Sequence, residues 1–464
     1  MNRLALLTQA LSSLQSWLNR FPGSDGGAAV QPGESGDADQ LHRQPSSGEM
    51  ETVLTELVRR LEGNYPFHSP VYAGQMLKPP HELAWLAHSL TMLINPNNHA
   101  LDGGPPTSVM EKEVIPQFAR MFGFTEPVLG HLTSSGTIAN LEALWVARNV
   151  HPGKGIAFSD QAHYTHERMC SVLGIPSFKI STTPAGEWNL HELESIKDRV
   201  GTVVVTMGTT GAGRVEPLHE LLPLFREMGL RVHLDAAYGG YFKLLEGTGA
   251  IDPLPWGWTG EADSLVIDPH KHGLQPYGCG CVLFRDPAVG RYYKHDSPYT
   301  YFSSDDLHLG EISLECSRAG AAAAGLWATL QVFGLEPMGR MGQVMQYCRK
   351  AAVRFADAAV ATGRFVMLEA PELDIVVYAG VPEVGARTLR GVSAVSERVF
   401  RRGMERGADG VYVSLYTVPA SQVLNVMPDL QPDAETVTVL RSVLMKPEHR
   451  DFVPELVRRL ESLL

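Results

Sequence analysis

The sequence has little charge, few cysteines and no long apolar run. Only 19% of its 464 residues are charged, and 39 lysines and arginines stand against 51 aspartates and glutamates, a formal charge of −12. With this acidic balance and no block of five or more basic residues, the chain has no positive electrostatic potential that would attract nucleic acid or an anionic membrane surface. No stretch approaches 18 uninterrupted apolar residues, so no transmembrane helix is predicted. Neither nucleic acid nor a membrane is therefore an expected partner.

The five cysteines are odd in number and scattered, at positions 170, 279, 281, 316 and 348. Cys279 and Cys281 are too close in sequence to bridge one another easily. We therefore expect reduced thiols and a cytoplasmic protein. The first residues offer no small-residue cleavage site, which argues against a secretory signal.

What the chain has in quantity is apolar residues, 44% of the total, which can bury a large core. Leucines recur at steps of three and four near the start, so residues 1–21 are predicted as an amphipathic helix that docks on another helix. Residues 22–50 are rich in Gly, Pro, Ser and Asp and are predicted as a flexible linker. Residues 51–104 are predicted as an N-terminal helical segment.

Between residues 105 and 334, short apolar runs alternate with helical patterns. The runs are bounded by turn residues or polar clusters and read GIAFSD, SFKIS, TVVVTMG, RVHLDAA, SLVID and CGCVLF. Their near-continuous hydrophobicity is typical of strands buried on both faces of a mostly parallel sheet. We therefore predict a large α/β domain over 105–334 and a smaller α+β domain over 335–464.

Polar and charged residues follow the ends of these predicted strands. Asp235, Asp268 and Lys271 stand where apolar runs stop, and open α/β sheets bind ligands at the carboxyl ends of their strands. Upstream, Ser135 and Gly136 lead into a predicted helix whose first turn presents free N–H groups to an anion. The sequence therefore predicts a ligand site that joins an amine, carboxylates and an anion-binding helix start.

Four motifs follow one another along the chain: TSSGTIAN, DQAHYTHE, HLDAAYGG and DPHKHG. In this order and at these separations they resemble the group II pyridoxal-phosphate-dependent decarboxylases, which include glutamate, aromatic amino acid and tyrosine decarboxylases. The resemblance covers about residues 65–335, and the ordered set is far more specific than any single motif. It implies fold type I of the PLP-dependent transferases, pyridoxal 5'-phosphate as cofactor, no metal, and a homodimer with active sites at the subunit interface.

The resemblance and the chemistry of PLP together assign roles to the motif residues. PLP needs a lysine that holds it, an acid that keeps its ring nitrogen protonated, and donors for its phosphate. Lys271 fits the first role and Asp235 the second, while His163 matches the histidine that stacks on the ring. The other implied cofactor contacts are Ser135, Gly136, Thr209 (with Thr210 as its alternative), Asp268, His270 and Ser317.

Residues on the substrate side are implied by the resemblance alone. Tyr301 and its alternative, Tyr299, lie in a segment where the family has a loop that closes over the active site. Either tyrosine, or the stacking histidine, could return a proton to the substrate carbon. Tyr72 and Gln75 fall in a loop on the substrate side. Arg318 could anchor a substrate carboxylate or make a structural ion pair.

These residues predict PLP-dependent decarboxylation of an aromatic or acidic L-amino acid to its amine and carbon dioxide. A PLP-dependent carbon–carbon lyase or aminotransferase is the first alternative. A zinc-dependent hydrolase that uses His163 and His166 is a remote one, because no third ligand follows at metal-like spacing. A silent interaction protein that retains the fold is another, although the intact Lys271 and Asp235 argue against it.

Overall fold

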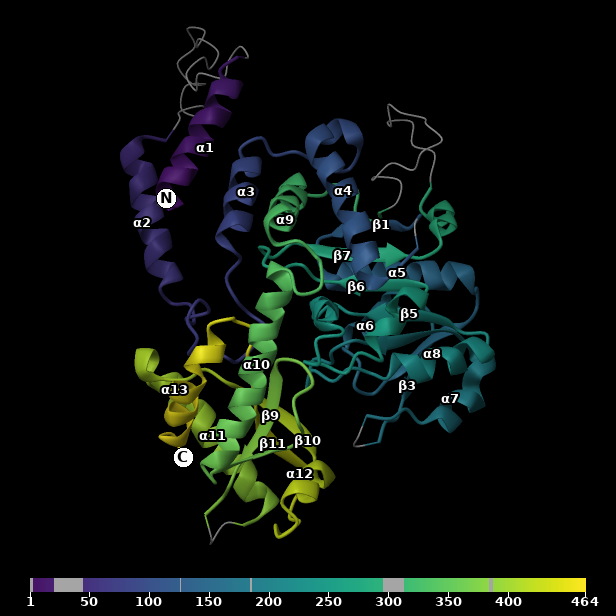
Figure 1. Cartoon of the computed structure of the whole chain (residues 1–464), viewed down its shortest axis with the longest axis vertical. Helices are drawn as coiled ribbons and strands as arrows, with labels where there is room; N and C mark the ends of the chain where they lie inside the picture. The colour runs from purple at the N-terminus through teal and green to yellow at the C-terminus, as the bar shows by residue number, and fades with distance from the viewer. Residues whose placement is uncertain (1–2, 21–44, 126, 184–185, 295–312, 384–386) are drawn as a thin grey trace, which may run out of the picture. The chain divides into compact units, whose positions relative to one another are not determined.

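The computed structural model describes residues 3–20, 45–125, 127–183, 186–294, 313–383 and 387–464. The chain divides into two units, residues 1–67 and residues 68–464. The first unit contains helices α1 (Arg3–Leu18) and α2 (Ser47–Leu61), and the second contains both β-sheets (Figure 1). Within the ranges given above, no helix has both the length and the apolar character needed to span a membrane.

The α-helices of the second unit are α3 (Glu82–Met92), α4 (Pro105–Phe122), α5 (Gly136–Val150), α6 (Thr165–Leu173), α7 (Leu190–Ile196), α8 (Leu218–Glu227), α9 (Gly320–Phe333), α10 (Arg340–Ala361), α11 (Leu389–Glu405), α12 (Ala420–Val426) and α13 (His449–Glu461). Short 3-10 helices lie at Leu101–Gly103, Lys197–Arg199, Gly240–Leu245, Trp256–Glu261, Pro287–Tyr292 and Gly407–Asp409.

The larger sheet has seven strands in the order β1-β7-β6-β5-β4-β2-β3. The strands are β1 (Leu129–Thr133), β2 (Gly155–Ser159), β3 (Ser177–Ile180), β4 (Val200–Thr206), β5 (Arg231–Asp235), β6 (Ser264–Ile267) and β7 (Gly280–Phe284). Strands β3, β2, β4, β5 and β6 pair in parallel, whereas β7 is antiparallel to both β6 and β1. The predicted mostly parallel sheet is confirmed. β1 is a strand that the sequence did not predict, because its short LGHLT sequence lacks the apolar run that marks the others.

Helices cover both faces of the larger sheet, and the alternation of buried side chains along a strand shows it. Val203 and Val205 of β4 face a core that includes α4, α8 and α9, whereas Val204 faces another core with α5 and α6. This burial on two sides explains why the strands read as continuous apolar runs rather than alternating patterns.

The smaller sheet is antiparallel and has the order β10-β11-β9-β8. Its strands are β8 (Phe365–Met367), β9 (Ile375–Gly380), β10 (Ser414–Pro419) and β11 (Thr436–Val443), and α10, α11 and α13 share its core. The backbone of Ala73 joins it by hydrogen bonds to Tyr412 and Val443. The domain limits at 104 and 334 remain predictions, because both sheets belong to the unit that spans 68–464.

Helix α2 begins inside the segment predicted as a linker over 22–50. Ser46 Oγ accepts a hydrogen bond from Glu49 N at 3.3 Å, and the Glu49 carboxylate accepts one from Ser46 N at 2.7 Å. This reciprocal capping box satisfies two helix-end donors and fixes the helix start four residues earlier than predicted. Composition hid the start, because serine and glycine read as linker residues. Residues 21–44 lie outside the described part of the chain.

Candidate active site

A cavity of about 220 Å³ lies where parallel strands of the larger sheet end. β4 ends at Thr206 and β5 at Asp235, and the two residues are register partners. Because parallel strands bring their carboxyl ends to one edge, the segments that follow them face a common space. The cavity brings together seven of the predicted cofactor residues, namely Ser135, Gly136, His163, Asp235, Asp268, His270 and Lys271.

Lys271 stands in the turn that follows β6. Its Nζ lies 3.0 Å from Asp268 Oδ2, and its backbone N donates to Asp268 O at 2.9 Å. The lysine side chain is 23% exposed, whereas that of Asp268 is almost fully buried. The carboxylate therefore holds a partly accessible amine against the cavity.

Asp235 is paired with a histidine that the sequence pattern offered only as a metal ligand. His166 Nε2 lies 2.9 Å from Asp235 Oδ2, and both residues are buried. Burial works to raise the pKa of Asp235, but the hydrogen bond and charge of His166, with the charge of Lys271, outweigh it and hold that pKa well below its usual range. Asp235 is therefore an ionised carboxylate that can pair with a protonated ring nitrogen. The signal for His166 was its place in the first turn of α6, three residues after His163.

His163 lies two residues before the start of α6 and lines the cavity. Its Nδ1 accepts a hydrogen bond from Thr165 N at 3.3 Å and lies 2.7 Å from Thr165 Oγ1. A ring nitrogen that accepts a hydrogen bond is unprotonated, so a neutral His163 carries its proton on Nε2. Burial lowers the pKa of His163 although the charge of Asp235 opposes the shift, which favours this neutral form.

His163 and His166 each use one ring nitrogen in a contact within the protein. Nδ1 of His163 contacts Thr165, and Nε2 of His166 contacts Asp235. Across the residues that the structure describes, no group of three or more potential ligands is gathered for a metal ion.

The start of α5 forms another wall of the cavity. Ser135 caps this helix, because its Oγ accepts a hydrogen bond from Ile138 N at 3.3 Å. A Cβ atom at Gly136 would collide with the Asp268 carboxylate, so the backbone can come this close only as glycine. Thr206 at the end of β4 also lines the cavity, and its buried Oγ1 has no hydrogen-bond partner among the described residues.

The residues that meet in this cavity fit PLP. Lys271 supplies the amine and Asp235 supplies the buried carboxylate that a protonated ring nitrogen requires. A helix N-terminus and an unpaired hydroxyl are suitable donors for a phosphate group. The lysine, the carboxylate and the donors come from four separate elements, namely the turn after β6, the end of β5, the start of α5 and the end of β4.

Thr210, rather than Thr209, lines the cavity. The Oγ1 of Thr209 accepts a hydrogen bond from Arg214 N at 3.1 Å and closes the turn after β4. Arg441 of β11 holds this turn from the other side by donating to Thr210 O at 2.7 Å and Gly211 O at 2.8 Å. The cavity lining favours the alternative, Thr210, because the Thr209 hydroxyl is engaged in the turn, and the cofactor contact of either threonine stays a prediction.

Arg318 has a structural role. Its guanidinium pairs with Glu111 and donates to Leu132 O at 2.8 Å and Asn98 O at 3.0 Å, and the side chain is buried. These partners occupy the guanidinium inside the protein, and the role of Arg318 as an anchor for a substrate carboxylate stays a prediction. The structural ion pair named as its alternative describes the contacts.

Three further predicted residues follow the lysine strand in sequence. Tyr299 and Tyr301 lie outside the described residues, so their role in proton return stays a prediction. Ser317 Oγ accepts a hydrogen bond from Asn97 Nδ2 at 3.1 Å and is not among the residues that line the cavity of its own chain. Its predicted contact with a neighbouring subunit's phosphate stays untested.

His270 connects the lysine turn with the predicted substrate-side loop. Its ring lies 4.9 Å from that of Tyr277, whose Oη donates to Met76 O at 3.2 Å. Tyr72 in this loop is buried and Gln75 is exposed. Neither lines the cavity in the described part of the chain, so their contact with substrate remains a prediction.

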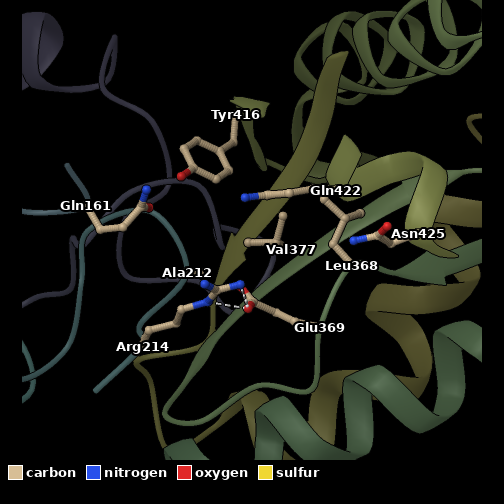
Figure 2. Close-up of a pocket in the computed structure, with 9 residues that line it drawn as sticks. All are labelled: Gln161, Ala212, Arg214, Leu368, Glu369, Val377, Tyr416, Gln422 and Asn425. Atoms are coloured by element: carbon tan, nitrogen blue, oxygen red, sulfur yellow. Dashed lines mark hydrogen bonds and ion pairs between the residues drawn. The ribbon is translucent and has the colours of Figure 1, made fainter. Parts of the chain in front are cut away.

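A second, smaller pocket of about 60 Å³ lies between the turn after β4 and the smaller sheet (Figure 2). Gln161 and Arg214 reach it from the larger sheet, and Glu369 and Tyr416 from the smaller one. Arg214 and Glu369 form an ion pair there, drawn as dashed lines in Figure 2. This polar contact ties the smaller sheet to the turn that carries Thr210.

Comparison with known sequences identifies the family. A profile of the pyridoxal-dependent decarboxylase conserved domain matches residues 49–380. The L-tyrosine decarboxylase of Enterococcus faecium is 28% identical over 456 residues, covering 76% of this chain and 74% of that protein. The L-2,4-diaminobutyrate decarboxylase of Acinetobacter baumannii is 27% identical over 428 residues, covering 81% and 79%.

Solved structures show the same fold. The Oryza sativa TDC structure with PLP and tryptamine superimposes with a TM-score of 0.76 and 17% identity, covering 99% of this chain and 97% of that one. The apo structure of mouse CSAD gives a TM-score of 0.75 and 18% identity, covering 99% and 98%. Because the family profile matches more than two thirds of the residues, this chain belongs to the pyridoxal-dependent decarboxylases, and it is a PLP-dependent amino acid carboxy-lyase.

Proposed function

We propose that this chain removes the α-carboxylate of an aromatic L-amino acid at the cavity that joins Lys271, Asp235 and Gly136. The observation that carries the proposal is the convergence of an amine, an ionised carboxylate and a helix N-terminus at one edge of the sheet. Bound PLP supplies an electron sink for the electrons left on Cα when carbon dioxide departs. Every other step belongs to residues of the chain.

Asp235 acts on the ring nitrogen of the cofactor. Its carboxylate stays ionised because His166 holds Oδ2 and Ala237 N donates to Oδ1 at 3.2 Å. An ionised partner keeps the ring nitrogen protonated, and a protonated ring draws electrons from Cα more strongly. Lys271 binds the cofactor between turnovers, and Ser135 and Gly136 receive its phosphate at the start of α5.

His163 returns the proton to Cα in this proposal. The hydrogen bond from Thr165 N into Nδ1 leaves the proton on Nε2, the nitrogen that is not engaged by Thr165. A neutral imidazole is too weak an acid for this step, so the ring first takes up a second proton on Nδ1, which it can donate to Thr165 Oγ1 2.7 Å away. Nε2 then gives its proton to Cα, and the ring returns to its neutral form. The tyrosines at 299 and 301 are the alternative donors.

The cavity walls favour an uncharged side chain over an acidic one. Lys271 is the only lysine or arginine among the described residues that line the cavity, and it is committed to the cofactor. An acidic side chain would need a second cation to balance its buried charge. The similar tyrosine decarboxylase supports the aromatic choice, and an acidic substrate is the alternative.

Carbon dioxide release by the PLP-loaded protein across a panel of free L-amino acids tests the proposal. We expect release from tyrosine or another aromatic amino acid and none from Lys271→Ala. Release from glutamate or aspartate alone would contradict the aromatic assignment and leave the reaction intact. A keto acid or an aldehyde as the main product would contradict decarboxylation at this site.

We also infer a homodimer. Large apolar side chains of α3, of the turn after it and of α4 are between about 45% and 58% exposed, namely Trp85, Met92, Leu93, Ile94 and Val109. Met92, Leu93 and Ile94 are consecutive, and an exposed apolar run of this kind is typical of a subunit interface. Light scattering after size exclusion should give twice the chain mass of 50.7 kDa, and a monomer at micromolar concentration would contradict the inference.

The five cysteines are free thiols, and all but Cys316 are buried. Free thiols support a reducing compartment, and we infer the cytoplasm.

A further inference from the structure

A buried carboxylate of the smaller sheet reaches two segments that line the cavity. Asp374 immediately precedes β9, and its Oδ1 accepts a hydrogen bond from Tyr238 Oη at 2.6 Å. Its Oδ2 lies 2.8 Å from His272 Nε2. Asp374 and His272 are completely buried and Tyr238 is nearly so. The two partners are 136 and 102 residues away in sequence, so only the tertiary structure creates the contact.

His272 directly follows Lys271, and both of its ring nitrogens are engaged. Nδ1 lies 3.1 Å from Tyr238 O, a pure acceptor, and Nε2 faces the Asp374 carboxylate. Both contacts are satisfied if the ring carries two protons, or if Asp374 lends a proton to the bond. In either case the ring has one orientation. Burial works to raise the pKa of Asp374, but the charge and hydrogen bond of His272 and the hydrogen bond of Tyr238 outweigh it and lower that pKa.

The residues joined in this way belong to the active site. Tyr238 lines the cavity and follows Asp235 by three residues, and His272 is adjacent to Lys271. Leu373, beside Asp374, would meet any side chain placed at Gly208 or Gly239, so these backbones approach it closely. The Asp374 carboxylate therefore fixes the turn that carries Lys271 against the segment that follows Asp235.

We propose that Asp374 is a positioning residue for Lys271, acting through His272 and Tyr238. It holds the backbone on either side of the cavity so that the lysine amine and the Asp235 carboxylate keep their separation. This inference rests on the proposed role of Lys271. The competing explanation is a buried polar cluster that only stabilises the smaller sheet.

Attachment of PLP to Lys271 distinguishes the two explanations. Apoprotein is mixed with PLP, quenched with borohydride at set times, and the fraction of modified Lys271 is measured by peptide mass spectrometry. We expect Asp374→Ala to slow attachment at least about tenfold and to lower kcat about tenfold to a hundredfold with KM within threefold, because small displacements of reacting groups reduce rates steeply. Asp374→Asn should recover most of both, because its amide can donate to Nε2 of a neutral His272 and still accept from Tyr238.

Two further variants guard against a general loss of folding. Tyr378→Phe removes a buried hydrogen bond of β9, the strand that Asp374 precedes, between Tyr378 Oη and Ser442 Oγ at 3.0 Å, and should leave attachment within twofold of wild type. His272→Phe keeps the ring volume but removes both hydrogen bonds, and should slow attachment as Asp374→Ala does. The double variant Asp374→Ala/His272→Phe should be no slower than either single variant, because both act on one contact.

The proposal is overturned if Asp374→Ala and His272→Phe attach PLP within twofold of wild type, or if Tyr378→Phe slows attachment as much as they do. A wild-type protein that attaches PLP elsewhere than at Lys271 would instead contradict the proposed site. The two failures are therefore distinguishable in one experiment.

Discussion

At the residue scale, single contacts decide the protonation of the site. Asp235 would be a costly buried charge alone, and His166 supplies the hydrogen bond that keeps it ionised. His163 obtains its tautomer from a backbone N–H two residues away. The chemistry of each group is thus set by one neighbour rather than by its residue type.

Replacing His166 by phenylalanine tests this dependence. The ring volume is kept, but Asp235 loses the partner that lowers its pKa, so we expect that pKa to rise. The acid limb of the kcat/KM profile should move to higher pH, and kcat should fall about tenfold to a hundredfold from the altered placement of the carboxylate. Steady-state kinetics between pH 5 and 8 measure both effects. His191→Phe, at an exposed histidine of α7, is the matched control. An unshifted acid limb in His166→Phe would contradict the assignment.

At the element scale, the site is built from strand ends and one helix start. The Gly136 backbone meets the Asp268 carboxylate so closely that the β6 turn and the α5 start act as one wall. Thr209 closes the turn after β4, and Arg441 holds the same turn from the smaller sheet. The start of α5 is therefore held by the turn after β6, and the turn after β4 is held by β11 of the smaller sheet.

Gly136→Ala should weaken PLP binding. The added methyl group would push the start of α5 away from Asp268, and the phosphate would lose well-aligned N–H donors. We expect at least a tenfold higher Kd for PLP, measured by absorbance titration of the apoprotein. Gly48→Ala in α2, where a Cβ meets nothing within 4 Å, should leave the Kd unchanged. Equal affinity in both variants would show that the phosphate binds elsewhere.

At the scale of the whole molecule, one buried acid links stability to pH. Glu216 accepts hydrogen bonds from Trp188 Nε1 at 3.1 Å and from Thr206 N at 2.7 Å. Burial raises its pKa to about 7, although these hydrogen bonds oppose the shift. The native protein therefore keeps a proton that the unfolded chain releases above its ordinary pKa of 4.5.

This difference makes the free energy of unfolding fall as pH rises from about 4.5 to about 7, and then level off. A shift of this size corresponds to roughly 3 kcal/mol over that window. Urea unfolding at several pH values should show the slope in wild type and lose it in Glu216→Gln. The variant should be less stable overall, because an amide cannot accept both hydrogen bonds. An unchanged slope would show that Glu216 is ionised in the native state.

The sequence by itself determined the sheet and the residues at its strand ends. Runs such as TVVVTMG and SLVID predicted buried parallel strands because both of their faces are covered, and Asp235 and Lys271 stand directly at run ends. These features are local, since the pattern and the residue lie within a few positions of one another. The sequence did not predict the weakly apolar β1 or the capped start of α2, because the local patterns of both resemble those of loops.

Only the tertiary structure decided which residues support the site. The pairing of Asp235 with His166 and of His272 with Asp374 joins residues 69 and 102 positions apart. The same holds for Arg318, for which the sequence left a substrate anchor and a structural ion pair open and could not name Glu111 as the partner. Such contacts depend on how elements pack, and residue type alone carries no information about a partner that the chain brings from elsewhere.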